Sequence, residues 1–140
     1  MAAFLDNGYT IAKPFGENAR YDFLADKDGY ISRVQVKSGW LRRGVVTFSC
    51  ESSHYHRGGC ARGYLEQADV FGVYCRDSGA VYVIPVGEVG CRGSFRLAPT
   101  RNGQRSGVRW AEDHVVAKLT PPELVGLPLW DGVANAGAPL

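Results

Sequence analysis

The segment that decides the fold reads RYDFLADKDGYISRVQVK and spans residues 20–37. Apolar and β-forming residues stand on both sides of Asp28-Gly29. An Asp-Gly pair between two such runs is typical of a tight hairpin turn. We therefore predict one strand over residues 20–26 and a second, antiparallel strand over residues 30–37.

This hairpin brings chemically useful side chains together. Residues two apart in a strand share a face, so Gln35 and Lys37 point the same way. Val34 and Val36 alternate with them and are expected to point into the core. Asp22 lies on the preceding strand and meets Gln35 and Lys37 if the register is normal. A carboxylate and an amide oxygen suit Mg²⁺, and a lysine beside them can hold or polarise an attacking water. An aspartate before a hairpin and a lysine on a solvated strand are also everyday features, so spacing alone leaves both interpretations open.

Further apolar runs extend the hairpin into a sheet. Predicted strands cover residues 45–50, 70–75 and 81–86, with an extended piece at 9–11 and an edge strand at 95–97. The hairpin and the strand after it form an antiparallel meander. Helical elements are expected at three places: the end of a helix at 2–5, a short helix near 64–68, and a helix over 110–116.

Length and composition predict one globular domain. The chain has 140 residues, 45% of them hydrophobic and 21% charged. We expect this domain to cover residues 1–118 and a Pro/Gly-containing tail to cover 119–140, which is a candidate arm for subunit contacts. No apolar run approaches the length of a membrane span, and Met1 does not begin a signal-peptide pattern. We therefore expect a cytoplasmic protein with no membrane partner.

Four cysteines allow two interpretations. Cys50 and Cys75 each end an apolar run, which is typical of buried free thiols, and a cytoplasm would keep all four reduced. Alternatively, Cys50 and Cys60 flank His54 and His56 in the spacing C-x3-H-x-H-x3-C, which offers four zinc ligands. The two histidines are too close for the usual finger spacing, so a polar loop over residues 51–69 at the mouth of a cleft is the other interpretation.

Positive charge clusters in the second half of the chain. Five arginines fall between residues 92 and 109 without an acidic residue among them, whereas the whole chain carries a formal charge of +2. Arginine forks suit phosphates and guanine edges, and 12 of the 16 basic residues are Arg. A GC-rich genome would also explain the preference for Arg, but not the clustering. The expected nucleic-acid contacts are Arg42, Arg43, Arg57, Arg62, Tyr64, Arg92, Arg96, Arg101, Arg105 and Arg109.

A family resemblance enters through the order of these segments. The ordered set consists of Arg20-Tyr21-Asp22, Val34-Gln35-Val36-Lys37, Ser49, Tyr64, Asp69-Val70-Phe71 and residues 82–86. It resembles the PD-(D/E)XK nuclease superfamily, and within it the group I intron-associated homing endonucleases that carry Gln in place of the middle acid. The resemblance implies an α/β fold with a restriction-endonuclease-like core, in which helices flank a mixed sheet of about five strands.

The resemblance also implies a site. Asp22 would ligate a divalent metal, Mg²⁺ or Mn²⁺. The side-chain oxygen of Gln35 and the backbone carbonyl of Val36 would add neutral ligands, and Lys37 would help to activate water for hydrolysis of a DNA phosphodiester. The family places a glutamate on the first helix, which is expected to be truncated here because that position falls before Met1. Either a longer protein carries this glutamate, or the chain lacks it and binds metal poorly.

Three functions follow from this interpretation. The first is a metal-dependent DNA endonuclease of the homing type. Because cutting both strands takes two active sites, it would be a homodimer or homotetramer. The second is a catalytically weakened or inactive DNA-binding module derived from such nucleases. The third is a resolvase of branched DNA.

Overall fold

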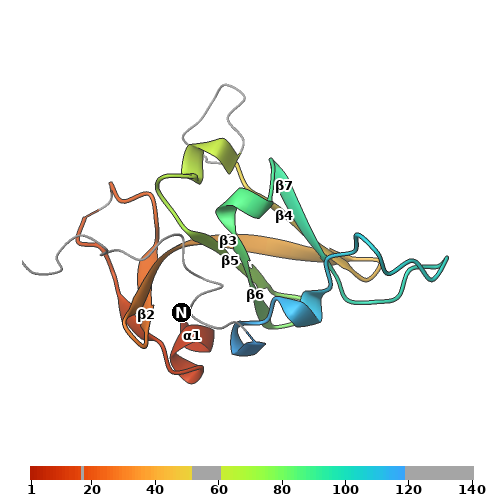
Figure 1. Cartoon of the computed structure of the whole chain (residues 1–140), viewed down its shortest axis with the longest axis horizontal. Helices are drawn as coiled ribbons and strands as arrows, with labels where there is room; N and C mark the ends of the chain where they lie inside the picture. Colours follow the sequence, from red (N-terminus) through yellow and green to blue (C-terminus); the bar gives the residue numbers. More distant parts are fainter. Residues whose placement is uncertain (17, 52–60, 119–140) are drawn as a thin grey trace, which may run out of the picture.

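The computed structural model describes residues 1–16, 18–51 and 61–118. Its core is one mixed sheet of seven strands, in which β1-β2-β3-β4-β7 form a path and β5 and β6 attach to it through β3 (Figure 1). The strands are β1 (Thr10–Ala12), β2 (Phe23–Lys27), β3 (Tyr30–Arg42), β4 (Val45–Ser49), β5 (Val70–Cys75), β6 (Ala80–Pro85) and β7 (Arg92–Arg96). The expectation of about five strands was too low, because β1 pairs with β2 and β7 pairs with β4 as full members of the sheet.

The long strand β3 organises the sheet. Its first half pairs antiparallel with β2, from Tyr30 to Val34, and its last residues pair antiparallel with β4, from Gly39 to Arg42. Its middle pairs in parallel with β5. Because Val34 and Gly39 each have one partner in β5 and one in β2 or β4, the strands β2 and β4 share the same edge of β3. Figure 1 shows β3 crossing the molecule between them.

Two tight turns fix the meander from β2 to β4. Asp28 and Gly29 have φ values of 55° and 82°, and Arg43 and Gly44 have 50° and 75°. Two consecutive residues with positive φ match the right-handed twist of the flanking strands. The predicted Asp-Gly hairpin and the predicted meander are therefore confirmed.

Helices cover little of the sheet among the described residues. The α-helix α1 spans Ala2–Asp6, and four 3-10 helices follow: η1 (Ala61–Tyr64), η2 (Val86–Glu88), η3 (Ala111–Asp113) and η4 (Val116–Lys118). The expected helix over 110–116 is wrong. Val115 forms a β-bridge with Tyr82, and Val83 N donates to the carbonyl of His114 (2.7 Å), so this segment extends the edge of β6. The expectation that helices flank the sheet is also wrong for the described residues, because α1 and the four 3-10 helices are short and cover little of it.

Hydrophobic clusters pack on both faces of the sheet. One cluster contains Phe48, Tyr64, Phe71, Tyr82 and Phe95, and the other contains Phe4 of α1 with Phe23 and Val34. The prediction that Val36 points into the core is wrong, because its side chain is 42% exposed whereas Val34 is fully buried. The pairing with β2 ends at Val34, so the layer of α1 and β2 does not reach Val36.

The expectation of reduced thiols holds only in part. Cys50 and Cys75 are free and buried, whereas Cys91 is disulfide-bonded. Cys60 and the predicted tail over residues 119–140 lie outside the described residues.

No helix among the described residues is long and apolar enough to cross a membrane.

Candidate active site

The site lies in a gap along one edge of β3. β2 pairs with this edge up to Val34 and β4 from Gly39, so residues 35–38 face neither strand. Asp22, immediately before β2, enters the gap. Its backbone N–H donates to the carbonyl of Val34 (2.8 Å), and its carboxylate accepts a hydrogen bond from Val36 N–H (2.6 Å, to Oδ2). The carboxylate thus takes the place of the missing strand.

Gln35 joins the same carboxylate. Its Nε2 donates to Oδ2 of Asp22 (2.7 Å) and lies 3.4 Å from the carbonyl oxygen of Val36. Two oxygens of the predicted ligand set therefore converge on one nitrogen. The structure brings Asp22, Gln35 and Val36 together as expected, on the exposed rim of the sheet.

Lys37 lies on the sheet face of Gln35 and is held tightly. Its Nζ donates to the carbonyl of Glu51 (2.9 Å) and to the hydroxyl of Tyr64 (3.2 Å). The ammonium also lies over the rings of Tyr64 and Phe71, 4.7 and 5.7 Å from their centroids. Such contacts fix the direction of a flexible side chain.

Tyr64 was expected to contact nucleic acid, but the structure gives it a different place. Its side chain is only 5% exposed and packs edge-on against Phe71. The hydroxyl accepts from Lys37. These contacts favour a role in supporting Lys37, which residue type alone did not indicate.

Arg33 and Asp69 form a structural link that the sequence analysis missed. Arg33 donates to both carboxylate oxygens of Asp69, through Nε (3.1 Å) and Nη2 (2.7 Å), and its backbone N–H donates to Oδ2 (2.7 Å). The hydrogen bond to Asp69 is the main cause that raises the pKa of the Arg33 guanidinium. Because Asp69 precedes β5, this link holds the segment that carries Tyr64 against β3.

Cys50 is a buried thiol near the site. Burial is the main cause that raises its pKa from 9.0 to about 11, and the positive charges of Lys37 and Arg109 oppose this shift. A zinc ligand must be a thiolate, so this environment disfavours Cys50 as one. His54, His56 and Cys60 of the zinc hypothesis lie outside the described residues.

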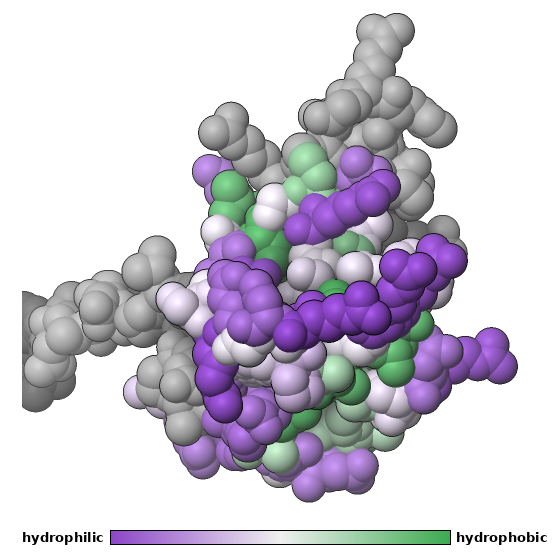
Figure 2. All heavy atoms as spheres, turned by 90° about the vertical axis from the view of Figure 1, so that its right-hand side faces the viewer, coloured by the Kyte–Doolittle hydropathy of each residue, from purple (hydrophilic) through white to green (hydrophobic). Residues whose placement is uncertain are grey.

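The predicted arginines occupy several places. Arg42, Arg43, Arg92, Arg101 and Arg105 are exposed, while Arg96 and Arg109 are half-buried. Arg109 donates to the carbonyl of Glu88 (3.1 Å). Arg57 lies outside the described residues, and the side chain of Arg62 is not among the described ones. Figure 2 shows hydrophilic side chains spread over the face at the right of Figure 1, where the β3–β4 turn and the loop after β7 lie.

The described part of the site contains few acidic side chains. No group of three or more His, Cys, Asp or Glu side chains that could hold a metal occurs among the described residues. A cation in the gap would therefore depend on one carboxylate, Asp22, and on neutral oxygens.

Comparisons with known proteins point to a nuclease family. The sequence pattern of the PD-(D/E)XK endonuclease family matches residues 1–117. Among solved structures, the chain is similar to the bacterial homing endonuclease I-Ssp6803I, with a TM-score of 0.55 and 26% sequence identity, over 74% of this chain and 70% of that one. A comparison with curated proteins finds no match. The resemblance stated from the ordered segments is confirmed at the level of the family.

Proposed function

Because the chain belongs to the PD-(D/E)XK endonuclease family, we propose that it hydrolyses DNA phosphodiester bonds at the gap in β3, in the manner of a homing endonuclease. Asp22, Gln35 and Val36 would hold a divalent metal, Mg²⁺ or Mn²⁺, and Lys37 would act on the water or the phosphate.

The donor set in the gap fits such a cation. Nε2 of Gln35 lies against Oδ2 of Asp22 and near the carbonyl oxygen of Val36, so a partly positive group already faces the two oxygens that would bind a cation. Rotating the Gln35 amide by half a turn exchanges its nitrogen for its oxygen. That oxygen would then face the carboxylate, which is stable only with a positive charge between them. This convergence is the observation that carries the proposal.

The residues at the gap would have separate roles in hydrolysis. A bound divalent cation would supply positive charge against the negative charge that builds on the scissile phosphate. Asp22 contributes the single negative ligand, and Gln35, being neutral, leaves the site more positive than a second carboxylate would. The ammonium of Lys37 has three N–H donors, and two of them go to Glu51 and Tyr64. The third has no hydrogen-bond partner among the described residues and would hold the attacking water or a phosphate oxygen.

Lys37 provides the test of the proposed hydrolysis. We expect Lys37→Ala to abolish nicking of supercoiled plasmid in Mg²⁺ while leaving DNA binding in a gel-shift assay largely intact. The reason is that the positive charge of Lys37 would stabilise the transition state of hydrolysis more than it stabilises bound DNA. Lys13→Ala, which removes an exposed lysine before β2, is the matched control and should nick normally. Nicking by Lys37→Ala at the wild-type rate would end this assignment.

A second candidate function is a DNA-binding module that does not cleave. It is favoured by the single carboxylate in the described site. Binding that weakens steeply with salt, together with no nicking at any Mg²⁺ or Mn²⁺ concentration, would establish it.

For the active enzyme we propose a homodimer or homotetramer, since cutting both DNA strands needs two active sites.

A further inference from the structure

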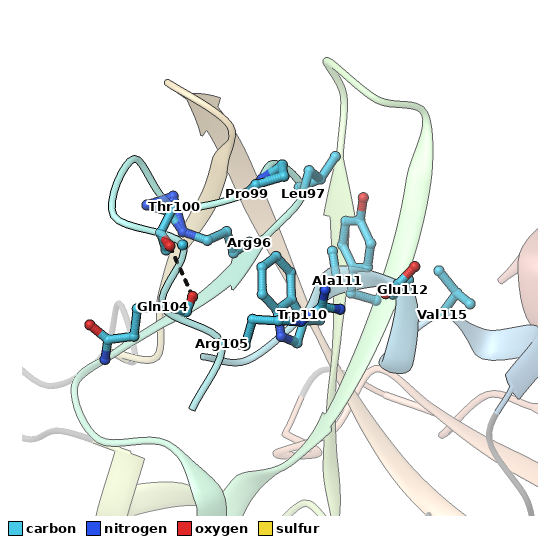
Figure 3. A pocket seen from close by; sticks show the side chains of 12 residues that line it. Arg96, Leu97, Pro99, Thr100, Gln104, Arg105, Trp110, Ala111, Glu112 and Val115 are labelled. Atoms are coloured by element: carbon cyan, nitrogen blue, oxygen red, sulfur yellow. Dashed lines mark hydrogen bonds between the residues drawn. The ribbon is translucent and has the colours of Figure 1, made fainter. Parts of the chain in front are cut away.

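A second hollow lies away from the gap, at the end of the molecule that Figure 2 faces. It is a pocket of about 510 Å³ beside Trp110, with Tyr82, Leu97 and Val115 as apolar lining and Arg96, Arg105 and Glu112 among the polar groups. Figure 3 shows the indole of Trp110 in the middle, with Thr100 and Gln104 on one side and Glu112 and Val115 on the other. Pockets of this size and mixed lining are typical of small-molecule sites.

An arginine-rich cavity adjoins this pocket. It has a volume of about 660 Å³ and is lined by Arg43, Arg96, Pro99 and Arg101. Arg96 and Pro99 line both hollows, so they form the shared wall. The pocket beside Trp110 and the arginine-lined cavity therefore stand side by side, contributed by the β3–β4 turn, β7 and the loop after it.

A planar group already lies against Trp110. The guanidinium carbon of Arg105 is 5.6 Å from the centre of the indole ring. Arg105 belongs to an exposed loop, so its side chain can leave this position at little cost. A flat ring that takes its place would gain stacking on the indole and would free Arg105 for a neighbouring anion.

We propose that this pocket binds an unpaired nucleotide, with its base against Trp110 and its phosphate among Arg96, Arg101 and Arg43. A nucleotide joins a flat apolar ring to a phosphate, which is the combination that the two hollows offer. The carboxylate of Glu112 stands in the base slot, where it repels phosphate and accepts hydrogen bonds from an amino group. It therefore favours guanine, which offers two neighbouring N–H donors (N1–H and the 2-amino group), over thymine, which offers only N3–H.

The pocket and the proposed active site share one face of the sheet. Lys37 pairs with Val73 of β5, and Val73 pairs with Tyr82 of β6, which lines the pocket. Two strand spacings make about 10 Å between the Cα atoms of Lys37 and Tyr82. The inference deepens the proposed function, because a DNA substrate would supply the unpaired nucleotide near the cut. Taking a base out of a duplex costs least where it is already unpaired.

The test uses single nucleotides and needs neither metal nor cleavage. The ¹⁵N-labelled full chain is titrated with dGMP, dTMP, deoxyguanosine and inorganic phosphate, and the indole N–H signal of Trp110 is followed by NMR. We expect dGMP to shift this signal with a Kd of about 1 mM. Deoxyguanosine and phosphate alone should bind about tenfold more weakly, since each fills one hollow only. dTMP should also bind more weakly than dGMP.

Matched variants separate the two hollows. Arg101→Glu should weaken dGMP at least tenfold and leave deoxyguanosine unchanged, while Arg76→Glu, an exposed arginine in the β5–β6 turn, should change neither. With the backbone amide of Thr100, which lines the same pocket, as the signal followed, Trp110→Ala should abolish dGMP binding, and Trp40→Ala, which removes an exposed tryptophan of β3, should not.

Failure of this proposal and failure of the nuclease proposal are distinguishable. A Trp110 signal that no nucleotide shifts, in a chain that still nicks plasmid, overturns the pocket alone. An equal response to phosphate and dGMP, or an equal loss in Arg101→Glu and Arg76→Glu, also overturns it. A chain that binds dGMP at Trp110 but never nicks DNA supports the pocket and overturns the nuclease.

Discussion

At the residue scale, the position of Lys37 depends on oxygens and rings that lie far from it in sequence. A free lysine side chain samples many rotamers, and its entropy must be lost before it can serve a reaction. Here the Glu51 carbonyl and the Tyr64 hydroxyl fix the ammonium in advance. In the proposed mechanism the hydroxyl acts through Lys37, so Tyr64 would be a positioning residue.

Removing this hydroxyl should slow cleavage without unfolding the chain. We expect Tyr64→Phe, which keeps the ring under the ammonium, to lower the nicking rate about tenfold, the equivalent of one hydrogen bond to a charged group of about 1.5 kcal/mol. The control is Tyr74→Phe, since Tyr74 is exposed on β5. A Tyr64→Phe variant that nicks at the wild-type rate, or that melts much earlier than Tyr74→Phe, would contradict this role.

Cys50 makes the stability of the protein depend on pH in the alkaline range. Its folded-state pKa of about 11 lies above the ordinary value of 9.0, so the folded state holds this proton longer than the unfolded state. The stability that the raised pKa of Cys50 contributes to the folded state is complete below pH 9 and is lost as the pH rises towards 11. Urea unfolding from pH 8 to pH 11 should show the wild type losing more stability than Cys50→Ala. Parallel curves for the two proteins would refute this dependence.

At the scale of elements, β4 and β7 meet without space for a side chain between them. A Cβ on Gly93 of β7 would overlap the ring of Phe48, its partner on β4. Phe48 in turn stacks on Phe95, with ring centroids 5.4 Å apart. This close approach lets the second edge of β4 join the sheet, and the strand is held by packing as well as by hydrogen bonds.

Filling this space should destabilise the protein. We expect Gly93→Ala to lower the free energy of unfolding by about 2 kcal/mol, in the range of overpacked cores. Gly90→Ala is the control, because a Cβ there meets no atom within 4 Å. Urea denaturation of both variants provides the comparison, and equal midpoints would show that the Phe48 ring moves aside freely.

The sequence predicted the elements whose signals are local. The Asp28-Gly29 turn and the strand Val70–Cys75 follow from turn chemistry and apolar runs, and both are found. The exposure of Val36 did not follow from alternation, because it depends on where β2 stops pairing with β3. The helix expected over 110–116 failed for a related reason: the edge of β6 offered Val115 a β-bridge.

At the scale of the whole molecule, the gap between β2 and β4 connects fold to function. One long strand serves two neighbours on a single edge, and the interval between them exposes the backbone of Val36 beside the carboxylate of Asp22. The contact between Asp22 and Gln35 was predicted from the register of the hairpin, and the shared sheet face of Gln35 and Lys37 from period-two alternation. The supports of Lys37 were not, because they come from tertiary packing.

Cation binding in the gap is the central claim, and paramagnetic NMR with Mn²⁺ tests it most directly. The account predicts that substoichiometric Mn²⁺ first broadens the backbone amide of Val36 and the side-chain amide of Gln35, and that Asp22→Asn removes this effect while Asp77→Asn, a change in the exposed β5–β6 turn, does not. Broadening centred elsewhere, or identical broadening in Asp22→Asn, would contradict it.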